Sequence, residues 1–202
     1  KPDIFIVFSV DVTVYGADRK ALDSDAEEKI IKKVNDNNIM LSKTVRYKEP
    51  KPARERMGNR PVIVGFGPAG MFCALMLARA GYRPVVVERG EAVEDRMKSV
   101  DSFWNGGRLN PESNAQFGEG GAGTFSDGKL NTQVKEVYGR ISKVLEIFVE
   151  HGADESITYE AKPHIGTDRL VYIVQSIRKE IESLGGEVRF NTRLVDIDLE
   201  KL

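Results

Sequence analysis

The sequence has few of the residues that build disulfide frameworks and metal sites. Its 202 residues include one cysteine and two histidines. Because Cys73 stands alone, an internal disulfide framework is excluded, and its place in an apolar helical pattern predicts a small core residue. His151 and His164 lack the spacing of zinc ligands, and the acidic residues form no ligand pattern either. We therefore predict no metal site.

The chain also lacks an excess of charge and any long apolar run. Its net charge is −1, so no overall field attracts nucleic acid or an anionic membrane. No apolar run approaches the roughly 20 residues that span a bilayer. The apolar residues 4–10 are soon interrupted by Asp11, which favours a strand over a signal peptide. We expect a cytoplasmic protein that binds neither nucleic acid nor membrane; the sequence leaves its oligomeric state open.

What the sequence does contain is a strand–helix–strand pattern over residues 60–90. Residues 61–64 form a short β-branched run that predicts a buried parallel strand. Residues 71–80 predict a helix that stops at Gly81, and residues 84–87 predict a second buried strand. This alternation indicates an α/β fold.

Three glycines with G-x-G-x-x-G spacing join the first strand to the helix. Gly65 permits the tight turn, Gly67 leaves room for a pyrophosphate, and Gly70 lets the helix pack closely on the strand. The start of the helix offers N–H groups and a partial positive charge to phosphates. Glu88 ends the second strand, where a carboxylate can accept hydrogen bonds from a ribose. The pattern predicts a dinucleotide site; the alternative is a glycine-rich turn in another kind of α/β unit.

A second glycine-rich stretch covers residues 108–131. Residues 123–129 read G-x-x-x-x-G-K, but position 130 is leucine, which cannot supply the magnesium-binding hydroxyl of a phosphate loop. This departure argues against nucleotide hydrolysis. We predict instead that backbone N–H groups of this loop wrap a second part of the same cofactor.

Other segments complete the predicted fold. Helical spacing of apolar residues predicts helices over residues 91–105 and 137–151. It predicts a third helix, with Thr167 or Asp168 as its N-cap, whose apolar face extends to Leu184. Strand-like patterns follow at residues 187–190 and 193–197.

The N-terminal residues 1–48 predict a small β-α-β (α+β) domain. Its expected strands cover residues 4–15 and 39–47, and its helix is capped by Ser24 or Asp25. Residues 49–59 carry two prolines and charges of both signs, which predicts a linker. We interpret the small domain as a packing or partner-binding module.

From about residue 60 onward the chain resembles bacterial FAD-dependent dehydrogenases of unassigned substrate, within the glutathione-reductase-like flavoproteins. The motifs that carry the resemblance are GFGPAGMFCALMLARAG, NPESNAQFGEGGAGTFSDGKLNT, KPHIGTDRL and GGEVRFNTRLVDI. The resemblance implies a Rossmann-like FAD-binding fold over residues 60–202, truncated before its final strand and its substrate domain, and inactive alone. The lone Cys73 excludes the disulfide-reductase branch.

The resemblance also implies which residues hold FAD. The first glycine turn surrounds the pyrophosphate, Glu88 holds the adenosine ribose with Arg89 nearby, and the backbone of Leu194 touches adenine. Lys129 either places positive charge near the cofactor or pairs with Asp127. The predicted cofactor-binding residues are Gly65, Gly67, Pro68, Ala69, Gly70, Glu88, Arg89, Gly120, Gly121, Ala122, Gly123, Thr124, Ser126, Lys129 and Leu194.

Three functions stay open at this stage. The first is an FAD-dependent oxidoreductase that acts on an unknown small molecule or electron donor. The second is an NAD-binding oxidoreductase without flavin, since Glu88 tolerates NAD and repels the extra phosphate of NADP. The third is a non-catalytic module in which the dinucleotide is structural and the N-terminal domain binds a partner. No catalytic residue is assigned; His164 either carries protons or orders its loop.

Overall fold

The computed structural model describes residues 7–42, 45–52, 57–130, 132 and 134–198. The chain divides into two compact units, residues 1–45 and 46–202. The division falls close to the predicted end of the N-terminal domain at residue 48.

The N-terminal unit contains one helix, α1 (Ser24–Val34), among its described residues. The side chain of Asp23 accepts a hydrogen bond from the Ala26 backbone N–H at 2.9 Å, so Asp23 is the N-cap rather than Ser24 or Asp25. At the other end, Asn35 adopts the left-handed conformation that commonly stops a helix. No residue of α1 is buried, because the described part of this unit packs no second layer against it.

The two strands predicted for this unit are wrong over residues 7–15, 39–42 and 45–47. Among the described residues of this unit, β-pairing is limited to an isolated bridge between Tyr15 and Ala21. A strand needs a neighbouring backbone to accept its hydrogen bonds, and alternation of apolar residues alone cannot supply one. Residues 4–6 and 43–44, which also belonged to these predicted strands, lie outside the described residues.

The second unit is an α/β structure with a parallel sheet, as the sequence predicts. The sheet contains β1 (Val62–Val64), β2 (Val85–Val87) and β3 (Glu187–Arg189), in that order. Ile63 is in register with Val86, and Val86 with Val188. The first crossover is α2 (Pro68–Arg79), and Gly81, with φ +86°, ends it as predicted.

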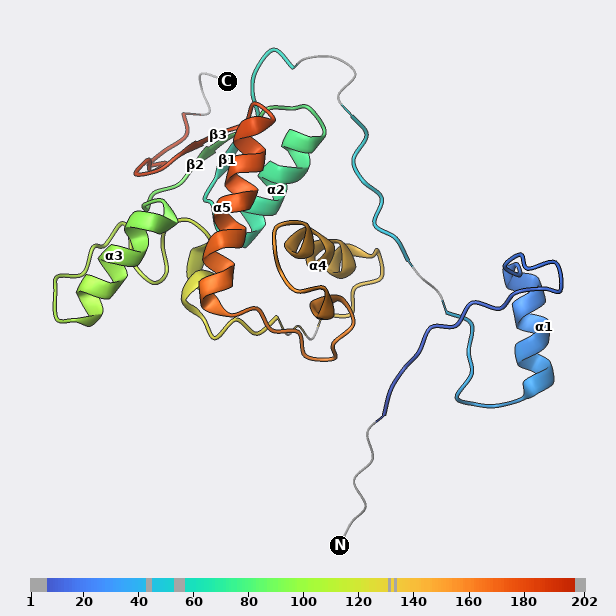
Figure 1. Cartoon of the computed structure of the whole chain (residues 1–202). Coiled ribbons are helices and arrows are strands. Elements are labelled where there is room, and N and C mark those ends of the chain that lie inside the picture. The colour runs from blue at the N-terminus through green and yellow to red at the C-terminus, as the bar shows by residue number, and fades with distance from the viewer. Residues whose placement is uncertain (1–6, 43–44, 53–56, 131, 133, 199–202) are drawn as a thin grey trace, which may run out of the picture. The chain divides into compact units, whose positions relative to one another are not determined.

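Helices α2 and α5 (Thr167–Ser183) lie side by side over one face of the sheet (Figure 1). Their apolar side chains bury Val86 completely. On the opposite face, Val62 and Val64 stay 65% and 58% exposed, so the strand predicted at residues 61–64 is present but the burial predicted for it is wrong on this face. Parallel sheets are normally covered on both faces, so the described residues supply only one of the two covering layers.

The remaining elements fill the long connection between β2 and β3. They are α3 (Val93–Trp104), the 3-10 turn η1 (Gly121–Phe125), α4 (Arg140–Glu150) and the 3-10 turn η2 (Glu155–Thr158). Helix α4 packs on α2 through an edge-to-face contact between Phe72 and Phe148, whose ring centroids are 5.4 Å apart. It begins later than predicted because Gly139, with φ +74°, occupies its N-cap.

Three further expectations are wrong. Gly166 is the N-cap of α5, so neither Thr167 nor Asp168 caps it; both lie in its first turn. Residues 193–197 form no strand, since no described segment pairs with them. Cys73 is exposed on α2 rather than packed in the core.

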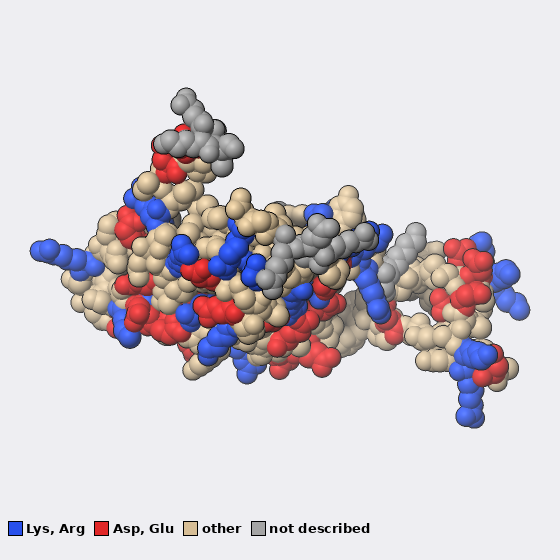
Figure 2. Space-filling model, turned by 90° about the horizontal axis from the view of Figure 1, so that it is seen from above, with Lys and Arg blue, Asp and Glu red and all other residues tan. Residues whose placement is uncertain are grey.

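The surface of the chain carries both signs of charge. Lys and Arg lie interspersed with Asp and Glu on the face drawn in Figure 2. None of the described helices combines the length and the apolar character needed to cross a membrane.

Candidate functional site

A cavity of about 290 Å³ opens at the carboxyl ends of β1 and β2. This edge of a parallel sheet is where open α/β folds bind ligands. The first glycine turn, the segment that follows β2, part of the second glycine stretch and the segment that follows β3 all contribute to its wall. Its lining residues are Val64, Gly65, Gly67, Val87, Glu88, Arg89, Gln116, Phe117, Gly118, Gly121, Thr192, Arg193 and Leu194.

The first glycine turn has the geometry for which its glycines were predicted. Gly65 has φ +89°, a conformation that other residues rarely adopt. A Cβ on Gly70 would collide with the carbonyl oxygen of Gly65, so this position requires glycine for the helix to approach the turn. Gly67 is the N-cap of α2 and provides no side-chain cap, which leaves the start of the helix open to an anion.

The second glycine stretch packs directly against the first turn. The Gly120 N–H donates to the Phe66 carbonyl at 2.9 Å, and a Cβ on Gly67 would lie 3.8 Å from the Cα of Gly121. Gly120 and Gly121 both have positive φ, at +81° and +63°. The two glycine segments therefore form one continuous backbone surface beside the cavity, which has no side chains at its closest point.

Glu88 fastens these segments together. Its carboxylate accepts from the backbone N–H groups of Phe66 at 2.7 Å, Gly90 at 2.8 Å and Gly118 at 3.1 Å, and the residue is 5% exposed. A carboxylate has about four acceptor sites, so this one retains capacity for a further donor from the cavity. Glu88 thus holds the two glycine segments in place and also presents a polar group to the cavity.

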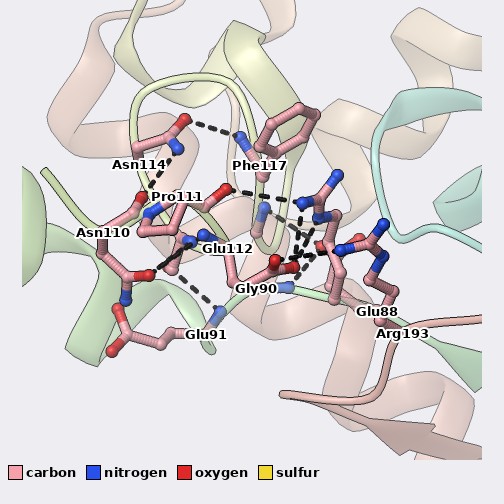
Figure 3. Close-up of polar contacts among 12 residues, drawn as sticks. Glu88, Gly90, Glu91, Asn110, Pro111, Glu112, Asn114, Phe117 and Arg193 are labelled. Carbon is pink, nitrogen blue, oxygen red and sulfur yellow. Dashed lines mark hydrogen bonds and ion pairs between the residues drawn. The ribbon is translucent and has the colours of Figure 1, made fainter.

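Arg89 forms the neighbouring part of the wall. Its guanidinium lies 4.1 Å from the centroid of the Phe117 ring and 2.8 Å from the Glu112 carboxylate. Glu112 comes from a loop stabilised by Asn110 and Asn114, whose side chains accept backbone N–H groups (Figure 3). Arg89 and Phe117 thus lie together in the cavity wall, and Glu112 balances the charge of the guanidinium.

A buried ionic cluster supports the second glycine stretch from behind. Glu119 accepts from the Val93 N–H at 2.8 Å, and burial raises the pKa of its carboxyl to about 7, against the opposing effect of that hydrogen bond and of Arg178. Arg96 is fully buried and donates to the backbone carbonyls of Asn114 and Glu119. Burial lowers the pKa of Arg96 to about 10. These contacts fix α3 beneath the loop that lines the cavity.

Six of the fifteen predicted cofactor residues line the cavity, and the other nine are not among its lining residues. Pro68, Ala69 and Gly70 form the first turn of α2, and Gly120, Ala122, Gly123 and Thr124 belong to the second glycine segment. Ser126 donates its hydroxyl to the Gly123 carbonyl, and Lys129 pairs with Asp127 at 2.8 Å with both side chains 63% exposed. His164 Nε2 lies 2.8 Å from the Asp127 carbonyl oxygen, a contact that orders this loop.

Several residues of the cavity escaped the sequence interpretation. Gln116, Phe117 and Gly118 lie within the second glycine-rich stretch but were not among the predicted cofactor-binding residues, and Thr192 and Arg193 follow β3. The aromatic residue next to a glycine run was an available signal for Phe117. Thr192 reaches the site because its N–H donates to the Glu88 carbonyl at 2.9 Å, a pairing that no local pattern encodes.

The chain is similar in sequence to known proteins, but these similarities do not establish its function. A protein of Clostridium beijerinckii (strain ATCC 51743 / NCIMB 8052) called "Uncharacterized protein" is 47% identical over 197 residues, which are 98% of this chain and 35% of that protein. The chain thus spans about a third of the length of this relative. "Glutamate synthase [NADH]" of Schizosaccharomyces pombe is 48% identical over 42 residues, 21% of this chain and 2% of that protein. No family model matches the chain.

Proposed function

We propose that this chain is the cofactor-binding part of an FAD-dependent oxidoreductase, with residues 60–202 in a Rossmann-like FAD-binding fold. The observation that carries the proposal is the position of Glu88. Glu88 directly follows β2 and lines the cavity, and its carboxylate accepts hydrogen bonds from backbone N–H groups of both glycine segments. A carboxylate at this point of a parallel sheet suits the hydroxyl groups of an adenosine ribose.

The residues present fit the adenosine diphosphate end of such a cofactor. The glycine surface of Gly67 and Gly121 gives room for a pyrophosphate, and the open start of α2 favours its negative charge. The remaining acceptor capacity of Glu88 suits a ribose hydroxyl, and Leu194 contributes an apolar wall for a base. When bound, FAD supplies the redox chemistry, which frees the protein from providing an acid–base pair for that purpose.

The similarity to a protein named for NADH supports a second candidate. A short match to "Glutamate synthase [NADH]" is compatible with a shared dinucleotide-binding segment, and an acid at position 88 suits NAD as well as FAD. Under this alternative, the same cavity binds the adenosine end of NAD and the protein contains no flavin.

Cofactor identity tests both candidates. The protein is incubated with FAD and NAD together, freed of unbound nucleotide and denatured, and the released nucleotide is identified by chromatography. Release of FAD, with flavin absorption in the visible spectrum before denaturation, supports the proposal. Release of NAD alone supports the alternative, and release of neither contradicts both.

A further inference from the structure

Two arginines of the cavity wall share a single glutamate as their ion-pair partner. Glu112 Oε1 is 3.1 Å from Arg193 Nη1 (Figure 3). Glu112 Oε2 is 2.8 Å from Arg89 Nη2. Arg89 and Arg193 line the cavity, whereas Glu112 is absent from its lining in the described part of the chain. Each oxygen of one carboxylate thus restrains an arginine from a different segment.

The charges around the ribose end of the cavity therefore balance. Glu88 and Glu112 contribute two negative charges, and Arg89 and Arg193 contribute two positive ones. A sugar that bears only hydroxyl groups meets no net charge there. A phosphate on the same sugar meets the Glu88 carboxylate, while both guanidinium groups are already engaged by Glu112.

We propose that Glu112 is a positioning residue that makes this site selective for an adenosine without a phosphate on its ribose 2′ position. It acts by occupying Arg89 and Arg193, which could otherwise bind that phosphate through paired N–H groups. This inference rests on the proposed function, because it assumes that the cavity receives an adenosine ribose.

The geometry of the arginines supports this role. Arg89 is held from two sides, by the Phe117 ring on one and by Glu112 on the other, so its guanidinium has a fixed plane. Arg193 is 57% exposed, and Glu112 is the carboxylate with which it pairs among the described residues. Loss of Glu112 frees Arg193 most, since Arg89 keeps its contact with the aromatic ring.

The test compares AMP with adenosine 2′,5′-bisphosphate as probes, with calorimetric titration of the whole 202-residue protein at low salt. We expect the unaltered protein to prefer AMP by at least about tenfold. Glu112→Gln should lower that preference by about fivefold, the size expected for a partly exposed charge contact. Glu160→Gln removes the same charge from an exposed position and should leave the preference unchanged.

A double variant separates charge balance from a structural effect. Glu112→Gln combined with Arg193→Gln restores the charge balance without restoring the contact, so the preference for AMP should return. If Glu112→Gln leaves the preference unchanged while both probes bind, the inference is overturned, and so it is if the double variant fails to recover it. If the unaltered protein does not bind AMP, the proposed function fails and this inference fails with it.

Discussion

Glu119 Oε1 lies 3.0 Å from Arg178 Nε, with the carboxylate side chain fully buried and that of the arginine 15% exposed. The two groups are close but not aligned for a hydrogen bond. The attraction therefore only partly offsets the cost of burying the carboxylate, and the pKa of Glu119 rises to about 7.

This pair makes the stability of the second unit depend on pH. A carboxyl whose folded-state pKa lies above its unfolded value binds more protons when folded, so stability falls as pH rises through the window between about 4.5 and 7. Glu119→Gln should remove up to about 3 kcal/mol of that pH-dependent change. Urea unfolding from pH 4.5 to 8 measures it, and an unchanged slope in the variant would show that folding does not raise the pKa of Glu119.

His151 should have the opposite effect to Glu119, because it makes the free energy of unfolding rise with pH. Burial lowers the pKa of its imidazole despite the nearby Glu180 carboxylate, and its Nδ1 lies 2.8 Å from Ser176 Oγ. A histidine whose folded-state pKa is below its unfolded value stabilises the fold above the unfolded pKa, and this contribution is lost as pH falls. His151→Gln should flatten the loss of stability below about pH 6.5. His164→Gln, at an exposed histidine, is the matched control and should keep that slope.

Glu88→Gln should weaken both the fold and nucleotide binding. The carboxylate accepts three backbone N–H groups, and an amide in its place turns one acceptor into a donor that faces them. We expect a loss of about 1–3 kcal/mol in the free energy of unfolding. AMP binding, measured by calorimetry, should weaken by about tenfold or more. Wild-type stability in the variant would mean that water satisfies these donors.

Gly70→Ala tests the close packing of α2 on the first glycine turn. The added methyl group meets the backbone carbonyl of Gly65, which cannot move aside as a side chain could. Thermal and urea unfolding should show a loss of about 1–3 kcal/mol. Gly123→Ala is the control for stability, because a Cβ there meets nothing within 4 Å. Equal stability of the two variants would contradict the proposed packing.

The sequence predicted best those elements whose first and last residues are set by residues nearby in the sequence. Strand β1, helix α2 with its stop at Gly81, and the special conformation at Gly65 all follow from local pattern and backbone sterics. The predicted strand over residues 193–197 failed because pairing needs a partner, and partners are not encoded in apolar alternation. The same reason explains the missing strands of the N-terminal unit.

Local pattern predicted the part of the site whose residues are close in sequence, and the family resemblance added Gly121 and Leu194. Gly65, Gly67 and Glu88 belong to one strand–helix–strand pattern, and all three line the cavity. Arg193 and Glu112 meet across the fold, and no spacing rule brings them together. The same limit applies to buried charge. On α3, Arg96 is fully buried because its guanidinium donates to the backbone carbonyls of Asn114 and Glu119, whereas the apolar Met97, Phe103 and Trp104 are exposed.

The central place of β2 in its sheet has a consequence for amide exchange. Backbone hydrogen bonds tie β2 to β1 through Val85 N–H and to β3 through Glu88 N–H, while Val86 is completely buried. Amides in such a position are released to solvent only when the surrounding structure opens as a whole. Val86 should therefore rank among the slowest-exchanging amides, and its exchange rate should report the global opening of the second unit.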